Sequence, residues 1–86
     1  MKVRVVVTGR SYHLTQQLPA ELVLADASTL DEALGRLSAL LPPGQDFPPS
    51  CLLAVAGRHV GTIARHESCP LQDGDELVLL TPVAGG

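Results

Sequence analysis

The chain has 86 residues and a mass of 9.0 kDa, which suffices for one small domain and leaves no room for a second hydrophobic core. Its residues are 45% apolar and only 17% charged, which argues against a disordered chain. A net charge of −3 and an aromatic content of 2% argue against nucleic-acid binding, which relies on cationic side chains and aromatic stacking platforms.

The sequence has no features of a membrane, secreted or metal-binding protein. No apolar run approaches the roughly 18–20 residues of a membrane span, and the N-terminus lacks the pattern of a signal peptide, so a cytoplasmic protein is expected. Cys51 and Cys69 are accordingly expected to be free thiols. His66 stands three residues before Cys69, but a zinc site needs four ligands and no second pair lies close in sequence, so no metal site is expected.

The first predicted elements are two strands. Residues 2–8 carry a valine at every second position, which is typical of a strand with one buried face. Residues 9–19 are a polar connection, and a second strand is predicted over residues 21–26. We expect the two strands to form an antiparallel hairpin with a long connection.

A helix is predicted next. Thr29 and Glu32 have the spacing of a capping box, in which each side chain bonds the other residue's backbone N–H. The segment 42–44, Pro-Pro-Gly, ends the helix because proline cannot donate to it. The apolar stripe of this helix is predicted to consist of Leu30, Ala33, Leu34, Leu37, Leu40 and Leu41.

Three more strands complete the predicted sheet. Residues 51–56 are continuously apolar, which indicates a strand buried on both faces or lying inside the sheet. A short strand is expected over residues 58–60 between two glycines, and the last strand over residues 76–81 follows a turn at 73–75. One amphipathic helix on one mixed sheet gives a two-layer α+β domain.

The usual catalytic residues are scattered. His13, His59 and His66 stand far apart, and no nucleophile elbow or phosphate-binding loop is present. The acidic turn, which we define as Asp73, Asp75 and Glu76, has the composition of a solvated turn rather than of an acid–base pair. The chain is therefore not expected to be an enzyme in its own right.

The end of the chain is the segment best suited to take part in a reaction. After Glu76 no charged side chain follows, Pro82 restricts the backbone, and Gly85 and Gly86 carry no Cβ. Such a thin end fits a narrow channel on another protein. Its terminal carboxylate is unreactive until it is activated, for example as an acyl-adenylate, and glycine leaves the carbonyl open to a nucleophile.

Residues 71–86, which read LQDGDELVLLTPVAGG, resemble the C-terminal signature of the MoaD/ThiS sulfur carriers, which are ubiquitin-like proteins. The resemblance implies a single β-grasp domain over residues 1–86 with four to five strands and a flexible tail over residues 82–86. It implies that a ubiquitin-activating-type enzyme, similar to MoeB or ThiF, adenylates Gly86 with ATP, after which sulfur replaces one oxygen to give a thiocarboxylate. The carrier itself would bind no cofactor.

The resemblance also implies partners. The chain length favours MoaD, the small subunit of molybdopterin synthase, whose large subunit (MoaE-like) would accept the sulfur. Carriers for thiamine or cysteine biosynthesis, a protein modifier joined through Gly86, and a passive interaction domain remain alternatives. The family's frequent asparagine after the middle strand is replaced here by Ala56 or Gly57. Residues expected to meet partners are Pro82, Val83, Ala84 and Gly85 in the tail, Leu79 beside it, and Asp73, Asp75 and Glu76 in the acidic turn, which would steer encounter with basic residues.

Overall fold

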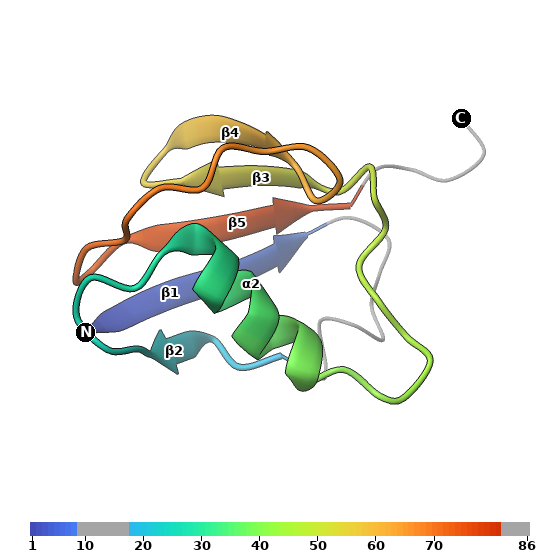
Figure 1. Cartoon of the computed structure of the whole chain (residues 1–86), viewed down its shortest axis with the longest axis horizontal. Coiled ribbons are helices and arrows are strands. Elements are labelled where there is room, and N and C mark those ends of the chain that lie inside the picture. The colour runs from blue at the N-terminus through green and yellow to red at the C-terminus, as the bar shows by residue number, and fades with distance from the viewer. Residues whose placement is uncertain (9–17, 82–86) are drawn as a thin grey trace.

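The computed structural model of the chain describes residues 1–8 and 18–81 (Figure 1). The predicted polar connection up to residue 17, with His13, and the predicted flexible tail 82–86 lie outside the described residues.

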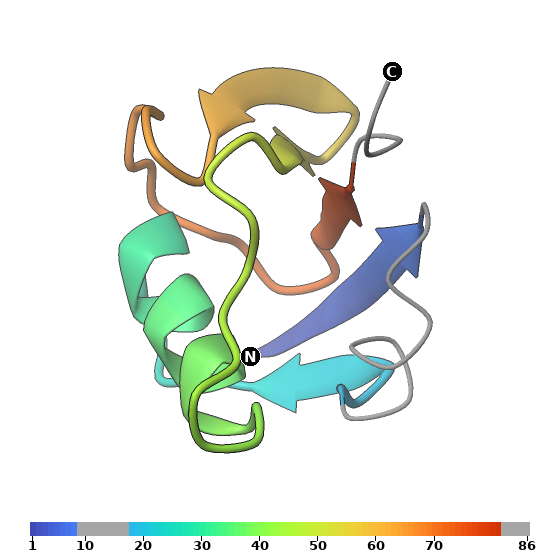
Figure 2. The same cartoon turned by 90° about the vertical axis from the view of Figure 1, so that its right-hand side faces the viewer.

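The described residues form a helix packed on a five-stranded mixed sheet. Figure 2 shows the helix α2 on one side of the sheet; among residues 1–8 and 18–81 no helix covers the opposite face, which we call the open face. The strand order is β2-β1-β5-β3-β4, with β1 and β5 parallel and the other pairs antiparallel. This arrangement is a β-grasp fold, as expected. The elements are β1 (Lys2–Thr8), β2 (Glu21–Val23), α2 (Leu30–Ala39), β3 (Leu52–Val55), β4 (Arg58–Thr62) and β5 (Glu76–Leu80).

The helix begins as predicted and ends earlier. The Glu32 N–H donates to Thr29 Oγ1 over 3.3 Å, and Glu32 Oε1 accepts the Thr29 N–H over 3.4 Å, so the capping box is present. The last helical residue is Ala39, because the N–H of Leu40 already bonds the carbonyl three residues back and Pro42 follows closely. Leu40 is 48% exposed and does not belong to the buried stripe, while Leu41 is buried beyond the helix end.

Strands β2 and β3 each differ from expectation in one respect. β2 ends at Val23 rather than at residue 26, and the chain turns at Asp26 and Ala27, where Ala27 has a φ of 66°. β3 lies inside the sheet, between β5 and β4, but only its Leu53 and Val55 are buried. Of the two alternatives predicted for this strand, a position inside the sheet is confirmed and burial on both faces is not, since the helix covers only one face of the sheet.

Strand β4 runs through Gly61, which was expected to end it. Gly61 has a φ of 129°, and a Cβ there would collide with the carbonyl oxygen of Arg65 and lie 2.7 Å from the Cα of His66. The register of β3 with β4 also shifts next to this position. Gly61 is therefore the point where the segment after β4 folds back over the strand.

The core lies between α2 and the three inner strands of the sheet, with Phe47 added from the connection that follows the helix. Its fully buried side chains include Val3 of β1, Leu53 of β3 and Leu77 of β5. The first and last strands of the chain thus pack side by side, and β1 and β5 end at the same end of the sheet.

Candidate functional site

The described chain leaves the sheet at Thr81, which immediately precedes the tail. Its side chain is 3% exposed. Its backbone N–H donates to the carbonyl oxygen of Thr8 over 2.9 Å, and its Oγ1 donates to the same oxygen over 3.0 Å. This is the last step of the parallel pairing, in which Thr8 lies opposite Leu80. The tail residues Pro82, Val83, Ala84, Gly85 and Gly86, predicted as the reactive end, lie outside the described residues, and the structure positions the point at which they begin.

An apolar strip lies beside this point on the open face of the sheet. Val6 and Leu80 are 37% and 41% exposed, although both side chains are large and apolar. Val78 lies between them and pairs with Val6, so the side chains stand on one face. The strip consists of Val6, Val78 and Leu80 together with the partly exposed Leu52 and Ala54 of β3.

Leu79 lies on the opposite face. Its side chain is fully buried beneath the helix with Leu77, because alternate residues of a strand face opposite sides. As the chain is folded, Leu79 offers no surface to a partner. The expectation that it docks beside the tail is corrected: the neighbouring Leu80 has that exposure.

The acidic turn lies at the other end of β5 from Thr81. Four residue steps separate Glu76 from Leu80, which is roughly 13 Å along a strand. Asp73 Oδ1 accepts the backbone N–H of Lys2 over 2.7 Å, Asp75 Oδ2 accepts that of Gln72 over 2.8 Å, and Glu76 pairs with Arg4 over 3.5 Å.

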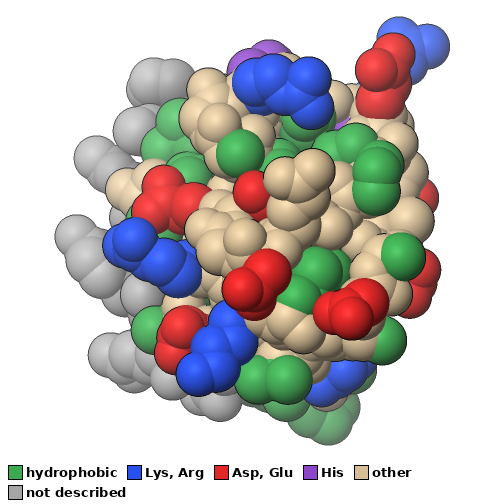
Figure 3. All heavy atoms as spheres, turned by 90° about the vertical axis from the view of Figure 1, so that its left-hand side faces the viewer, with side chains coloured by type: hydrophobic (Ala, Val, Ile, Leu, Met, Phe, Trp, Pro, Cys, Tyr) green, Lys and Arg blue, Asp and Glu red, His purple; other side chains and the backbone are tan. Residues whose placement is uncertain are grey.

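These bonds give the carboxylates a structural role. The turn itself forms as predicted, with Gly74 at a φ of 87°. Figure 3 shows this end of the molecule, where acidic and basic side chains are interspersed. The carboxylates therefore close the turn against β1, and their expected role in steering a partner stays a prediction.

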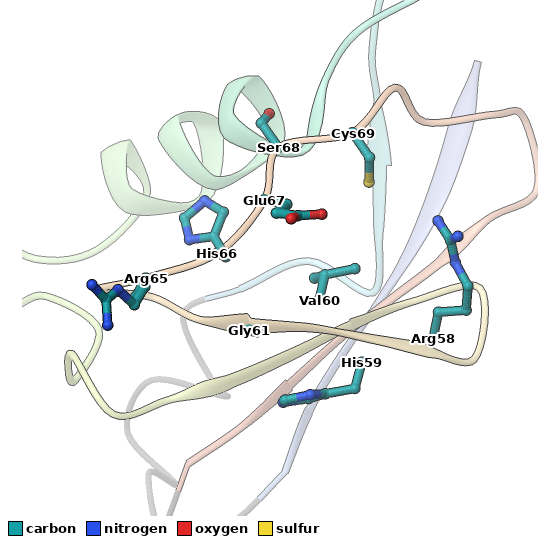
Figure 4. A pocket seen from close by; sticks show the side chains of 9 residues that line it. All are labelled: Arg58, His59, Val60, Gly61, Arg65, His66, Glu67, Ser68 and Cys69. Carbon is teal, nitrogen blue, oxygen red and sulfur yellow. The ribbon is translucent and has the colours of Figure 1, made fainter.

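A cavity of about 530 Å³ lies between β4 and residues 65–69. Figure 4 shows that Arg58 and Arg65 stand at opposite ends of this cavity and that His59 points away from it, so the cationic groups do not converge. Among residues 1–8 and 18–81, no three His, Cys, Asp or Glu side chains gather in a way that would hold a metal ion.

His66, which lines the cavity, is hydrogen-bonded to the helix. Nε2 of His66 lies 2.6 Å from Oδ1 of Asp31, and this hydrogen bond raises the pKa of His66 and lowers the pKa of Asp31. Both cysteines are free, as predicted, and burial raises the pKa of the Cys51 thiol to about 11, which keeps that thiol protonated and unreactive. The described residues thus hold no assembled catalytic set.

Residues 5–86 match the ThiS family, and the match includes the Gly85-Gly86 ending. The chain belongs to the ThiS family. A search of the curated proteins found no match to this ThiS-family chain. Proteins of the family are small sulfur carriers rather than enzymes and have the β-grasp fold described above, so membership suggests a sulfur-carrier role. No helix within the described part of this ThiS-family chain is long and apolar enough to cross a membrane.

Two features of the ThiS-family chain were not found by sequence reasoning. One is the anchoring of Thr81 on Thr8, which depends on pairing between residues 73 positions apart. The other is the exposure of Val6 and Leu80. The alternation of residues 2–8 already placed Val6 on the face opposite the other valines, which is the one signal that could have identified the strip.

Proposed function

We propose that this chain is a sulfur carrier whose C-terminal Gly86 is adenylated and converted to a thiocarboxylate for molybdopterin biosynthesis. The observation that carries the proposal is the family match through Gly86. The anchored start of the tail at Thr81 supports it, because a carrier needs a fixed body from which its end extends.

The proposed chemistry needs no catalytic group from the carrier. A MoeB/ThiF-like enzyme binds ATP, a carboxylate oxygen of Gly86 attacks the α-phosphate, and pyrophosphate leaves. A sulfur nucleophile then attacks the carbonyl carbon, and AMP leaves with one former carboxylate oxygen. The absence of a Cβ at Gly85 and Gly86 leaves the carbonyl accessible at both steps.

We assign docking to the apolar strip, with Leu80 nearest the start of the tail. An exposed apolar patch of this kind typically marks a protein contact. It lies on the same face as the Arg4–Glu76 pair, so a partner covering it would meet an apolar centre and a charged margin. The acidic turn would then steer a basic partner from the margin of the contact.

The sulfur acceptor is proposed to be the large subunit of molybdopterin synthase, which would make this chain the small subunit. Two free thiols fit a reducing, cytoplasmic setting. Presenting the thiocarboxylated protein separately to a MoaE-like subunit, a thiazole synthase and a cysteine synthase tests the acceptor, since only the true acceptor consumes the thiocarboxylate and forms its product. Isopeptide-linked Gly-Gly remnants on cellular lysines would instead favour the protein-modifier alternative.

Intact mass spectrometry tests the carrier chemistry directly. With a MoeB/ThiF-like enzyme, ATP and a sulfur donor, the mass should rise by the difference between sulfur and oxygen. Omission of ATP and deletion of Gly86 should each abolish the change. A lack of exchange in the intact chain with activating enzymes of both types would overturn the proposal.

A further inference from the structure

We propose that Thr81 is a positioning residue for the activation of Gly86: its hydroxyl fastens the end of β5 to Thr8 and so fixes where the tail begins. This inference rests on the proposed function. It concerns the KM of the activating enzyme for the carrier, about which the family match says nothing.

The hydroxyl of Thr81 is not needed for packing. Among the described residues only Ser28 and Thr81 are buried polar side chains. A buried polar group has to be hydrogen-bonded to avoid a large desolvation penalty, so an apolar side chain would be the simpler occupant of such a place. The Oγ1 of Thr81 is bonded, and its partner is a carbonyl that already accepts the N–H of the same residue.

The extra bond lies where the strand pairing has least support. Pro82 follows directly and has no N–H, so the next residue cannot donate to the sheet. Strand ends open more readily than strand centres. On its other side the end of β5 pairs with β3, where Leu80 lies opposite Leu52. Toward β1, the hydroxyl of Thr81 adds a second bond to the Thr8 carbonyl, which the backbone N–H of Thr81 alone would otherwise bond.

The attachment matters for recognition by the activating enzyme. Each residue that leaves the sheet lengthens the segment that must be ordered when the enzyme takes up Gly86, and ordering lowers affinity. Once bound, the glycine carboxylate is held by the enzyme rather than by the sheet. Loss of the hydroxyl should therefore raise the KM for the carrier and leave kcat nearly unchanged.

The test is ATP–pyrophosphate exchange by a MoeB/ThiF-like enzyme with the carrier concentration varied. Thr81→Val keeps the side-chain shape and removes the hydroxyl, so we expect its KM to rise about 3- to 10-fold, the effect of one hydrogen bond. Thr81→Ser keeps the hydroxyl and should return the KM to the wild-type value. If Thr81→Val does not fold, Thr81→Ala carries the same expectation.

Ser28→Ala is the matched control. It removes the other buried hydroxyl, which donates to the carbonyl of Ala25 over 2.7 Å in the turn before α2, far from the end of β5 (Figure 1). Its KM should equal that of the wild type even if its stability falls. An unchanged KM in Thr81→Val, or an equal rise in Ser28→Ala, overturns the positioning role. Absence of exchange with the wild type overturns the proposed function, and the inference falls with it.

Discussion

Nε2 of His66 lies 2.6 Å from Oδ1 of Asp31, and Nδ1 of the same ring lies 2.8 Å from the carbonyl oxygen of Thr62. A carbonyl accepts only, and an ionised carboxylate accepts only, so the imidazolium, with both nitrogens protonated, satisfies both contacts. The ring thereby joins the segment after β4 to the first turn of α2. Neither His66 nor Asp31 belongs to the apolar strip or to the tail.

The pair should make stability depend on pH. Because the pKa of His66 is raised above 6.5, its contribution is complete below 6.5 and is lost as pH rises through the raised value. Because the pKa of Asp31 is lowered below 3.8, its contribution is complete above 3.8 and is lost as pH falls through the lowered value. The contribution should therefore be greatest between 3.8 and 6.5.

Urea unfolding of the wild type and of His66→Gln across this range measures the effect. The difference in unfolding free energy should shrink from about pH 5 to about pH 8. It should be modest, because Asp31 is exposed and solvent screens the pair. Asp31→Asn should flatten the same dependence, and a difference that stays constant with pH would show that the ring acts only through packing.

The elements that could be predicted from the sequence are those specified by residues close together in the chain. Thr29 and Glu32 specify the start of the helix within one turn, and the valine alternation specifies β1. β5 reads Glu-Leu-Val-Leu-Leu, and such a run carries no alternation to say that Leu79 is buried and Leu80 exposed. That choice is made by the pairing of β5 with β1 and β3, which join distant parts of the chain.

The same limit applies to the remaining differences. Gly61 looked like a strand end because glycine punctuates strands, and only the approach of Arg65 and His66 reveals why it lies inside one. The link between His66 and Asp31 spans 35 positions and has no motif. The candidate site was predictable as a chain end, whereas its attachment through Thr81 was not.

The hairpin between β3 and β4 offers a stabilising substitution. Ala56 and Gly57 form its two-residue turn with φ values of 50° and 82°. Two positive φ values are typical of a type I′ turn, which favours Asn-Gly, and alanine is strained in this region. Ala56→Asn should raise the unfolding free energy by about 0.5–1 kcal/mol. Chemical denaturation of the wild type and of Ala56→Asn measures this difference in unfolding free energy.

Gly57→Ala is the opposing control for this turn, because it places a second Cβ in the left-handed region and should lower stability. Both variants should keep wild-type exchange of oxygen for sulfur, since the turn lies at the end of β5 away from Thr81. An Ala56→Asn protein no more stable than the wild type would contradict the assignment of strain to this residue.

Two glycines should respond in opposite ways to the same substitution. Gly61→Ala would drive a Cβ against the backbone of Arg65 and His66, so stability should fall by about 2 kcal/mol or more. Gly35→Ala, in the exposed part of α2, meets nothing within 4 Å and should raise stability by up to about 1 kcal/mol. Thermal and urea unfolding compare the two, and equal effects would show that space around Gly61 is not the constraint.

Substitutions at Leu79 and Leu80 should distinguish an effect on folding stability from an effect on partner binding. Leu79→Ala removes a fully buried side chain and should lower the unfolding free energy by about 2–5 kcal/mol. Leu80→Ser removes an exposed one and should change stability by less than about 1 kcal/mol.

In the pyrophosphate exchange assay Leu80→Ser should raise the KM for the carrier, because the substitution replaces apolar contact area with a polar group. Val23→Ser, which alters an exposed valine on β2 outside the strip, is the matched control and should leave the KM unchanged. If Val23→Ser weakened activation as much as Leu80→Ser, the strip would not be the docking surface, and the enzyme would have to contact the carrier across the whole open face or through the tail alone.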